Sequence, residues 1–330
     1  MEQLWGVYHK EIPGFLQEFA VTAPLLRLKQ VGMNCGCEYT RFPRFANLAP
    51  YSRYDHSVGA ALIVWHFTEN MEQSLAALFH DVTTPVFAHV VDFLNGDHLK
   101  QESTEVGVWE CLADSAEVCD LLKRYDIALE DIVDYHRYPI ADNDSPALSA
   151  DRLEYTMGNL LNYGFAPLGT IREMYEDLIV GTDEMGSPEV VFRTPEIAAK
   201  FTRLALLNSH VYVADEDRFA MEALAGILRG AIERQVLRRD DLMTIEPKVI
   251  SKLKADALCA AKWHRFCGYS ELLRAKERPE SGDWICVDAK KRWIDPLATG
   301  RGRVSAWNKA AAEDIAAFCE LDFSHWMCAE

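Results

Sequence analysis

The chain reads Leu-Ala-Ala-Leu-Phe-His-Asp-Val-Thr-Thr-Pro-Val-Phe-Ala-His-Val-Val-Asp from residue 75 to residue 92. An apolar run ends at His80 and Asp81, a short turn follows, and a second apolar run carries His89 and Asp92. The pattern predicts one helix over residues 71–81 and a second over residues 85–94. Burying histidine beside aspartate is costly unless another group binds them, and a metal cation would do so. A satisfied structural contact within each pair is the alternative.

Two further segments favour the metal site. His56 lies 24 residues before His80, in the sequence Arg-Tyr-Asp-His-Ser-Val-Gly of residues 53–59. Asp151 lies 70 residues after Asp81, in the sequence Asp-Arg-Leu-Glu-Tyr of residues 151–155. The order His, His-Asp, Asp, each on a predicted helix, resembles the HD-domain metal-dependent phosphohydrolases. The flanking residues resemble the deoxynucleotide triphosphohydrolase-like branch of that superfamily, over roughly residues 20–160.

This resemblance implies an all-α fold: an HD-domain helical bundle with additional C-terminal helices and a small β-hairpin. Two imidazoles and two carboxylates offer nitrogen and oxygen donors, which suit one divalent transition metal (manganese, iron, cobalt, nickel or zinc) better than calcium. The resemblance also implies a His-Asp pair that protonates the leaving group, two arginines that hold phosphate and a tyrosine beside the substrate sugar. The expected metal ligands are His56, His80, Asp81 and Asp151, the catalytic pair is His89 and Asp92, and the substrate-binding residues are Arg53, Arg152 and Tyr155.

Several positions depart from the pattern of that branch, and all of them bear on the substrate. The branch carries two histidines along the phosphate path, an aspartate that reads a sugar hydroxyl, and basic residues farther along the chain. Because a triphosphate needs several cations, the sequence predicts that metal binding is retained and that triphosphate release is weak. The replacing residues are Thr84 and Gln101-Glu102 for the histidines, Asn159 for the aspartate, and Ala214-Asp215-Glu216-Asp217 for the basic residues.

Composition limits the partners and the compartment. The net charge of −17 repels nucleic-acid backbones and anionic membranes at long range, although a metal and a few arginines can still attract a small anion. Nine cysteines without a Cys-x-x-Cys pair favour a reduced cytoplasmic protein, and a metal or redox role for Cys35 and Cys37 is the alternative. We see no signal-peptide pattern and no apolar run of ~18 residues, so we expect no membrane span.

Three segments are predicted along the chain. Residues 1–180 form the HD-domain core with the metal site, and residues 1–12 are a lead-in strand or extended arm. Residues 181–278 form a helical extension packed on the core, in which residues 190–192 are a short strand. Residues 279–330 form a C-terminal β-hairpin and helix, and the hairpin strands are residues 284–288 and 292–296.

The leading hypothesis is a metal-dependent phosphohydrolase whose partner is a small-molecule phosphate ester, such as a nucleoside monophosphate or a related metabolite. One alternative is a deoxynucleoside triphosphate triphosphohydrolase with a substituted site. The other is a non-catalytic, regulatory HD protein that binds a nucleotide or a partner. The ligand set and His89-Asp92 favour an enzyme, whereas Thr84 and Gln101 favour the regulatory protein. A role for His136 at the site and a homo-oligomer are left open.

Overall fold

The structure is a computed structural model that describes residues 1–96, 98–99 and 107–329. Helices dominate and a small sheet accompanies them, so the predicted all-α fold class is confirmed. The helices up to residue 162 are α1 Glu2–Tyr8, α2 Gly14–Ala20, α3 Ala23–Arg27, α4 Arg53–Thr68, α5 Met71–Phe79, α6 Val90–Asn95, α7 Val108–Ala113, α8 Ala116–Tyr125 and α9 Ala150–Asn162. The later helices are α10 Leu168–Glu176, α11 Pro195–Tyr212, α12 Asp215–Glu233, α13 Glu246–Ala255, α14 Ala257–Gly268, α15 Val304–Trp307 and α16 Lys309–Cys319.

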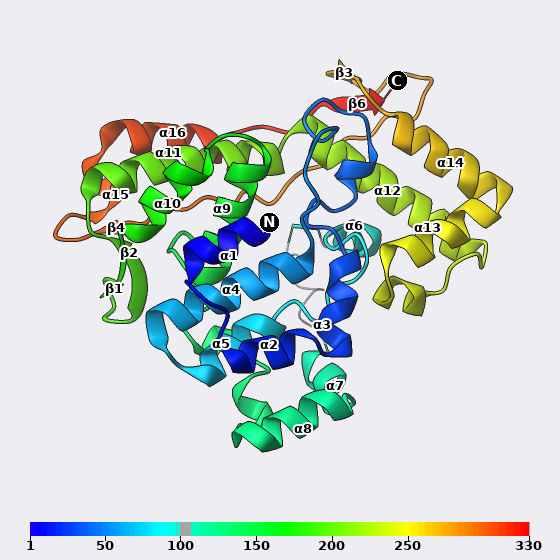
Figure 1. Cartoon of the computed structure of the whole chain (residues 1–330). Helices are drawn as coiled ribbons and strands as arrows, with labels where there is room; N and C mark the ends of the chain where they lie inside the picture. Colours follow the sequence, from blue (N-terminus) through cyan, green and yellow to red (C-terminus); the bar gives the residue numbers. More distant parts are fainter. Residues whose placement is uncertain (97, 100–106, 330) are drawn as a thin grey trace.

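Helix α4 is central, since it packs against α1, α3, α5 and α9 (Figure 1). Its start is fixed by a capping box: Ser52 Oγ accepts from the Asp55 amide at 3.2 Å, and the Asp55 carboxylate accepts from the Ser52 amide at 2.9 Å. Small residues at positions 59–61 allow neighbouring helices to approach, and residues 56–64 are all buried. The N-terminal turn of α4 is therefore held in one position.

Two local predictions, one at residues 1–12 and one at the start of the second helix of the 75–92 stretch, are wrong. Residues 2–8 form helix α1 instead of a strand or extended arm, because their buried side chains recur at three- and four-residue spacing. The second helix of the 75–92 stretch begins at Val90 and not at residue 85. Phe87 and Ala88 adopt φ angles of +60° and +46°, which a right-handed helix cannot contain.

Two large clusters of buried apolar side chains hold the molecule together. One cluster is built around α4, α5 and α9 and runs from Leu4 to Val304, whereas the other is built around α6, α12 and α14 and runs from Cys35 to Ala329. Each cluster contains residues from all three predicted segments. The segments 1–180, 181–278 and 279–330 thus share their cores, and their division into separate units stays a prediction.

The strands form two small sheets. Strands β1 Leu178–Thr182 and β2 Pro188–Phe192 are antiparallel, which confirms the predicted strand at residues 190–192. In the same sheet β2 pairs in parallel with β4 Leu297–Ala298, which pairs in antiparallel with β5 Gly302–Arg303. The second sheet pairs β3 Leu272–Ala275 with β6 Trp326–Ala329. No helix within the described ranges is both long enough and apolar enough to cross a membrane.

The C-terminal hairpin lies at β4–β5 and not at residues 284–296, where it was predicted. Gly300 and Gly302 adopt φ angles of +71° and +79°, which a tight turn requires and which the Ala289-Lys290-Lys291 segment does not supply. Within residues 284–296 only Ile285 forms a β-bridge, to Met327. We call residues 284–296 the strap, because they run as an extended orange segment across the molecule between β3 and β4 (Figure 1).

Candidate metal centre

Three helix ends bring two imidazoles and one carboxylate together. His56 lies in the first turn of α4, His80 follows the last residue of α5, and Asp151 lies in the first turn of α9. The Nε2 atom of His56 is 3.2 Å from His80 Nε2 and 3.0 Å from Asp151 Oδ1, and His80 Nε2 is 3.4 Å from the same oxygen. Ligands bonded to one metal at ~2.1 Å lie ~3.0–3.4 Å apart at tetrahedral or octahedral angles. These three residues could therefore hold one metal ion.

The second nitrogen of each imidazole is occupied. His80 Nδ1 lies 2.7 Å from the carbonyl oxygen of Ala77, which can only accept, so Nδ1 carries the proton. His56 Nδ1 lies 2.7 Å from Oε2 of Glu154, and the carboxylate fixes the same tautomer. Both rings thus turn the lone pair of Nε2 toward the same point, which is the arrangement that metal-binding histidines need.

The carboxylates around His56 and His80 favour the binding of a positive charge at the cluster. Burial lowers the pKa of His56, but the carboxylates of Asp151 and Glu154 outweigh it and raise the pKa to about 10. Burial raises the pKa of Asp151, but the two imidazoles hold that pKa well below its ordinary value. The cluster therefore binds positive charge strongly, and a proton or a metal ion can supply it.

Asp81 faces the same point from a slightly greater distance. Its Oδ2 is 3.9 Å from His56 Nε2 and 3.7 Å from His80 Nε2. Arg53 Nη1 donates to Oδ2 at 2.8 Å and Thr84 Oγ1 donates to Oδ1 at 2.7 Å. Burial raises the pKa of Asp81, but the Arg53 guanidinium and the imidazoles outweigh it, so Asp81 stays ionised. Its role as a fourth ligand stays a prediction.

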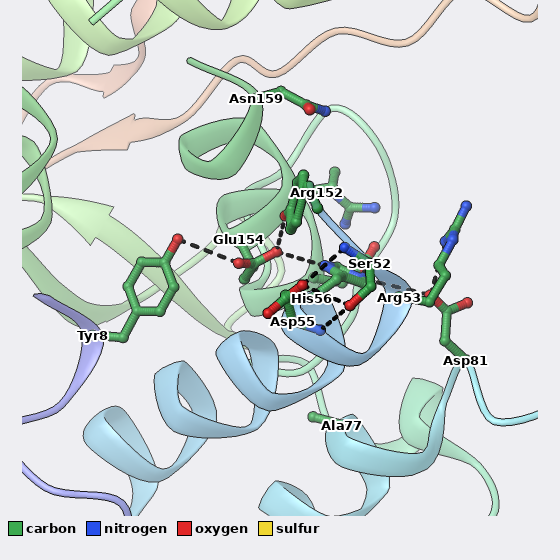
Figure 2. A network of polar contacts seen from close by, with 12 residues as sticks. Tyr8, Ser52, Arg53, Asp55, His56, Ala77, Asp81, Arg152, Glu154 and Asn159 are labelled. Atoms are coloured by element: carbon green, nitrogen blue, oxygen red, sulfur yellow. Dashed lines mark hydrogen bonds and ion pairs between the residues drawn. The ribbon is translucent and has the colours of Figure 1, made fainter. Parts of the chain in front are cut away.

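Glu154 orients His56, and the sequence reasoning gave it no role (Figure 2). This buried carboxylate also accepts from the hydroxyls of Tyr51 at 2.5 Å and Tyr8 at 3.5 Å. A Cβ added at Gly59 would lie 2.6 Å from the Glu154 side chain, so glycine is needed for α4 and α9 to approach this closely. The available signal was a glycine one turn after His56 and a glutamate one turn after Asp151.

A cavity of about 410 Å³ opens beside the cluster. His89 and Tyr155 line it, and His89 Nδ1 lies 2.9 Å from the buried carboxylate of Asp92, so the predicted His-Asp contact is present. Burial raises the pKa of Tyr155 to about 12, which keeps its hydroxyl protonated and able to donate. The lining also includes Arg53, Tyr135, His136, Asp142, Arg152, Asn159, Tyr163, Tyr212, Asp217 and residues 289–293.

The two predicted phosphate-binding arginines differ in what their guanidinium groups do. Arg53 donates to Asp81 and leaves a buried Nε without a hydrogen-bond partner among the described residues. Arg152 donates from Nε to the carbonyl of Ala147 at 2.8 Å, from Nη2 to Asn143, and its Nη1 is 3.2 Å from Asp142. Arg152 thus holds the loop before α9, although it also lines the cavity.

The acidic segment at the start of α12 contributes less charge to the cavity than its sequence indicates. Asp215 lies 2.5 Å from both Arg218 and Arg274, and Glu216 pairs with Arg274 at 3.3 Å. Asp217 is the member of this segment that lines the cavity. Burial raises the pKa of Asp217 to about 8, so this carboxyl is mostly uncharged at neutral pH.

His136 and Cys35, also singled out from the sequence, line the cavity. His136 contacts Asp142 through Nδ1 at 2.8 Å. Cys37 is buried, with its thiol 3.7 Å from Oδ1 of the cavity-lining Asp217. The structure describes all nine cysteines, and each is a free thiol. Gln101 and Glu102 lie outside the described residues.

No protein-family model matches the chain. The uncharacterized protein YdhJ of Bacillus subtilis is 26% identical over 253 residues, which cover 76% of this chain and 74% of that protein. The metal-dependent phosphohydrolase cns2 of Cordyceps militaris is 26% identical over 121 residues, which cover 36% of this chain and only 34% of that protein.

Two crystal structures resemble the whole chain. A hypothetical protein from Aquifex aeolicus has a TM-score of 0.64 at 16% identity and covers 96% of this chain and 92% of its own. A phosphohydrolase from Bacteroides thetaiotaomicron has a TM-score of 0.63 at 14% identity and covers 97% of this chain and 96% of its own. At these identities the likeness shows that the fold is shared.

Proposed function

We propose that this protein is a metal-dependent phosphohydrolase of the HD type that acts on a phosphate monoester. The observation that carries the proposal is the convergence of His56, His80 and Asp151 at the wall of a cavity that also holds His89. The partial match to a metal-dependent phosphohydrolase and the fold shared with a phosphohydrolase support it.

The metal would be held by His56, His80 and Asp151, with Asp81 as a fourth ligand. A divalent transition metal at this position supplies positive charge for the phosphoryl group and makes water more acidic. Manganese, iron, cobalt, nickel and zinc all suit this donor set. Arg53 stands beside the metal position, oriented by Asp81, and its fork of donors is suited to phosphate oxygens.

His89 would move the proton that the leaving oxygen needs. Its Nδ1 faces Asp92, which leaves Nε2 for the cavity. Burial lowers the pKa of His89, Asp92 raises it, and the positive charges of Arg292 and Arg53 lower it further. A bound phosphate dianion would offset those two charges and raise the pKa of His89. Substrate binding would thus protonate the group that must next donate.

The charges around the cavity favour a monoester over a triphosphate. Arg152 donates hydrogen bonds to the loop before α9, and the Thr84 hydroxyl donates to Asp81, so neither donor is left for additional phosphate oxygens. A volume of about 410 Å³ lies toward the lower end of the ~300–1,000 Å³ range of small-molecule sites. A nucleoside monophosphate or a related metabolite is the substrate class that we propose, and a deoxynucleoside triphosphate is the alternative within the same chemistry.

A regulatory role without catalysis is the second candidate. Thr84 stands where the resembled branch has a histidine, and its contact with Asp81 is structural. Such a protein would bind metal and ligand but would release no phosphate.

The test is a metal analysis followed by a phosphatase screen with and without manganese, cobalt or nickel. We expect phosphate release from p-nitrophenyl phosphate or a nucleoside monophosphate that depends on added metal. His80→Ala should lose metal and activity together. His264→Ala, an exposed histidine on α14, should keep both. Silence on every ester by a protein that carries its full metal content would contradict the proposal and favour the regulatory candidate.

A further inference from the structure

We infer that Arg292, on the strap, is the principal arginine that binds the phosphate group of the ligand. This inference rests on the proposed function, since it concerns the same cavity. Sequence spacing gave no reason to place residue 292 at the cavity that His56 and Asp151 line, and the strap carries it there.

The strap is held on both sides of Arg292, so the position of this residue is defined. Ile285 exchanges backbone hydrogen bonds with Met327 at 2.8 Å and 2.7 Å, and the Asp295 amide donates to the Pro146 carbonyl at 2.9 Å. Lys291 also lines the cavity, but its Nζ is engaged, since it donates to the carbonyl oxygens of Cys319 and Leu321 at 2.5 Å and 2.7 Å. Arg292 lines the same cavity and is partly buried.

Arg292 has no hydrogen bond or ion pair with any residue in the described ranges, in contrast to its neighbours. Arg53 is paired with Asp81, Arg152 with the loop before α9, and Lys291 with backbone carbonyls. A guanidinium that lines a cavity without an anionic partner there can contact a ligand directly. An anion in the cavity would give the Arg292 guanidinium a hydrogen-bond partner, because its planar fork of donors matches two phosphate oxygens.

The field of Arg292 reaches the groups that face the cavity. Its positive charge lowers the pKa values of His89, Tyr155, Tyr212 and Asp217, although burial is the larger influence on each. These four side chains come from the start of α6 and from α9, α11 and α12. Since burial keeps Asp217 largely uncharged at neutral pH, that carboxyl does not neutralise Arg292. The positive charge of Arg292 can therefore act on a ligand in the cavity.

Calorimetric titration of manganese-loaded protein with inorganic phosphate tests this inference without requiring turnover. We expect Arg292→Gln to weaken phosphate binding by about 10- to 100-fold, the range for one charge-assisted contact. Arg292→Lys keeps the charge but loses the fork, so it should weaken binding by a smaller factor. Arg301→Gln, an exposed arginine in the nearby β4–β5 turn, is the matched control and should bind like wild type. Metal content and thermal unfolding are measured on each variant, to show that each is folded and loaded.

The outcomes separate this inference from the proposed function. Wild-type affinity in Arg292→Gln would overturn the role of Arg292 and leave the phosphohydrolase proposal standing. Weakened phosphate binding in Arg292→Gln, with no ester hydrolysed by wild type, would support the role of Arg292 and contradict catalysis. Failure of metal-loaded wild type to bind phosphate at millimolar concentration would overturn both.

Discussion

Gly59→Ala should weaken metal binding although residue 59 touches no metal ligand in our proposal. The added Cβ would lie 2.6 Å from Cγ and Oε1 of Glu154 and 2.8 Å from Cδ, whereas real Cβ atoms stay beyond 3.0 Å of such neighbours. Glu154 must therefore shift, and its 2.7 Å contact with His56 Nδ1 must lengthen. Losing the partner that orients a ligating histidine typically costs ~10–100-fold in metal affinity, or about 1.4–2.7 kcal/mol.

The assay is a manganese titration followed by calorimetry, together with thermal unfolding of the same samples. Gly226→Ala is the matched control, because residue 226 lies inside α12 and an added Cβ meets nothing within 4 Å. It should bind manganese like wild type and gain ~0.5–1 kcal/mol of stability from helix propensity. Glu154→Gln keeps the shape of the side chain and should lose metal affinity by a smaller factor. Wild-type metal affinity in a folded Gly59→Ala protein would refute the role of Glu154.

Three further results are expected. His89→Ala should lower turnover by ~10²–10⁴-fold at unchanged metal content, since it moves a proton and is not a ligand; an equal loss of metal, measured by elemental analysis, would contradict that role. Asp217→Asn should raise the free energy of unfolding at pH 9 by ~1–3 kcal/mol or more and by much less at pH 5, because burial raises the pKa of Asp217 to about 8, so the wild type loses stability progressively as pH rises from the ordinary carboxyl pKa of ~4 to about 8; denaturant unfolding at both pH values checks it, and equal shifts would count against it. Two missing charge-assisted contacts, at ~1.5–3 kcal/mol each, predict deoxynucleoside triphosphate turnover ~10²–10⁴-fold below that of the best monoester; robust release of tripolyphosphate at micromolar deoxynucleotide would show that other groups replace the missing histidines.

The order of the motifs along the chain and their resemblance to the HD-domain phosphohydrolases predicted the cluster, and each of its members sits at a helix end with a readable signal. Ser52 and Ser149 cap the helices that carry His56 and Asp151, and an apolar run leads directly to His80. Spacing along the chain and the types of the ligands then limited the chemistry. The mostly helical fold and the contact between His89 and Asp92 were predicted from the same short-range patterns.

The parts that sequence reasoning missed depend on contacts between distant segments. Glu154 acquires its role only when α9 meets α4 at Gly59, and Arg292 reaches the cavity only because backbone bonds at Ile285 and Asp295 hold the strap. The acidic residues at the start of α12 were misleading for the same reason, because their charge is partly offset by a distant arginine. Asp215 is neutralised by Arg274, which lies 59 residues later in the chain.

Anomalous diffraction from crystals of the manganese-loaded protein, measured at the metal absorption edge, tests the central claim most directly. The account predicts one strong peak ~2.0–2.3 Å from His56 Nε2, His80 Nε2 and an oxygen of Asp151. It also predicts that this peak disappears in His80→Ala and remains in His264→Ala. A peak elsewhere, or no peak in a protein that elemental analysis shows to be loaded, would contradict the metal centre proposed for these residues.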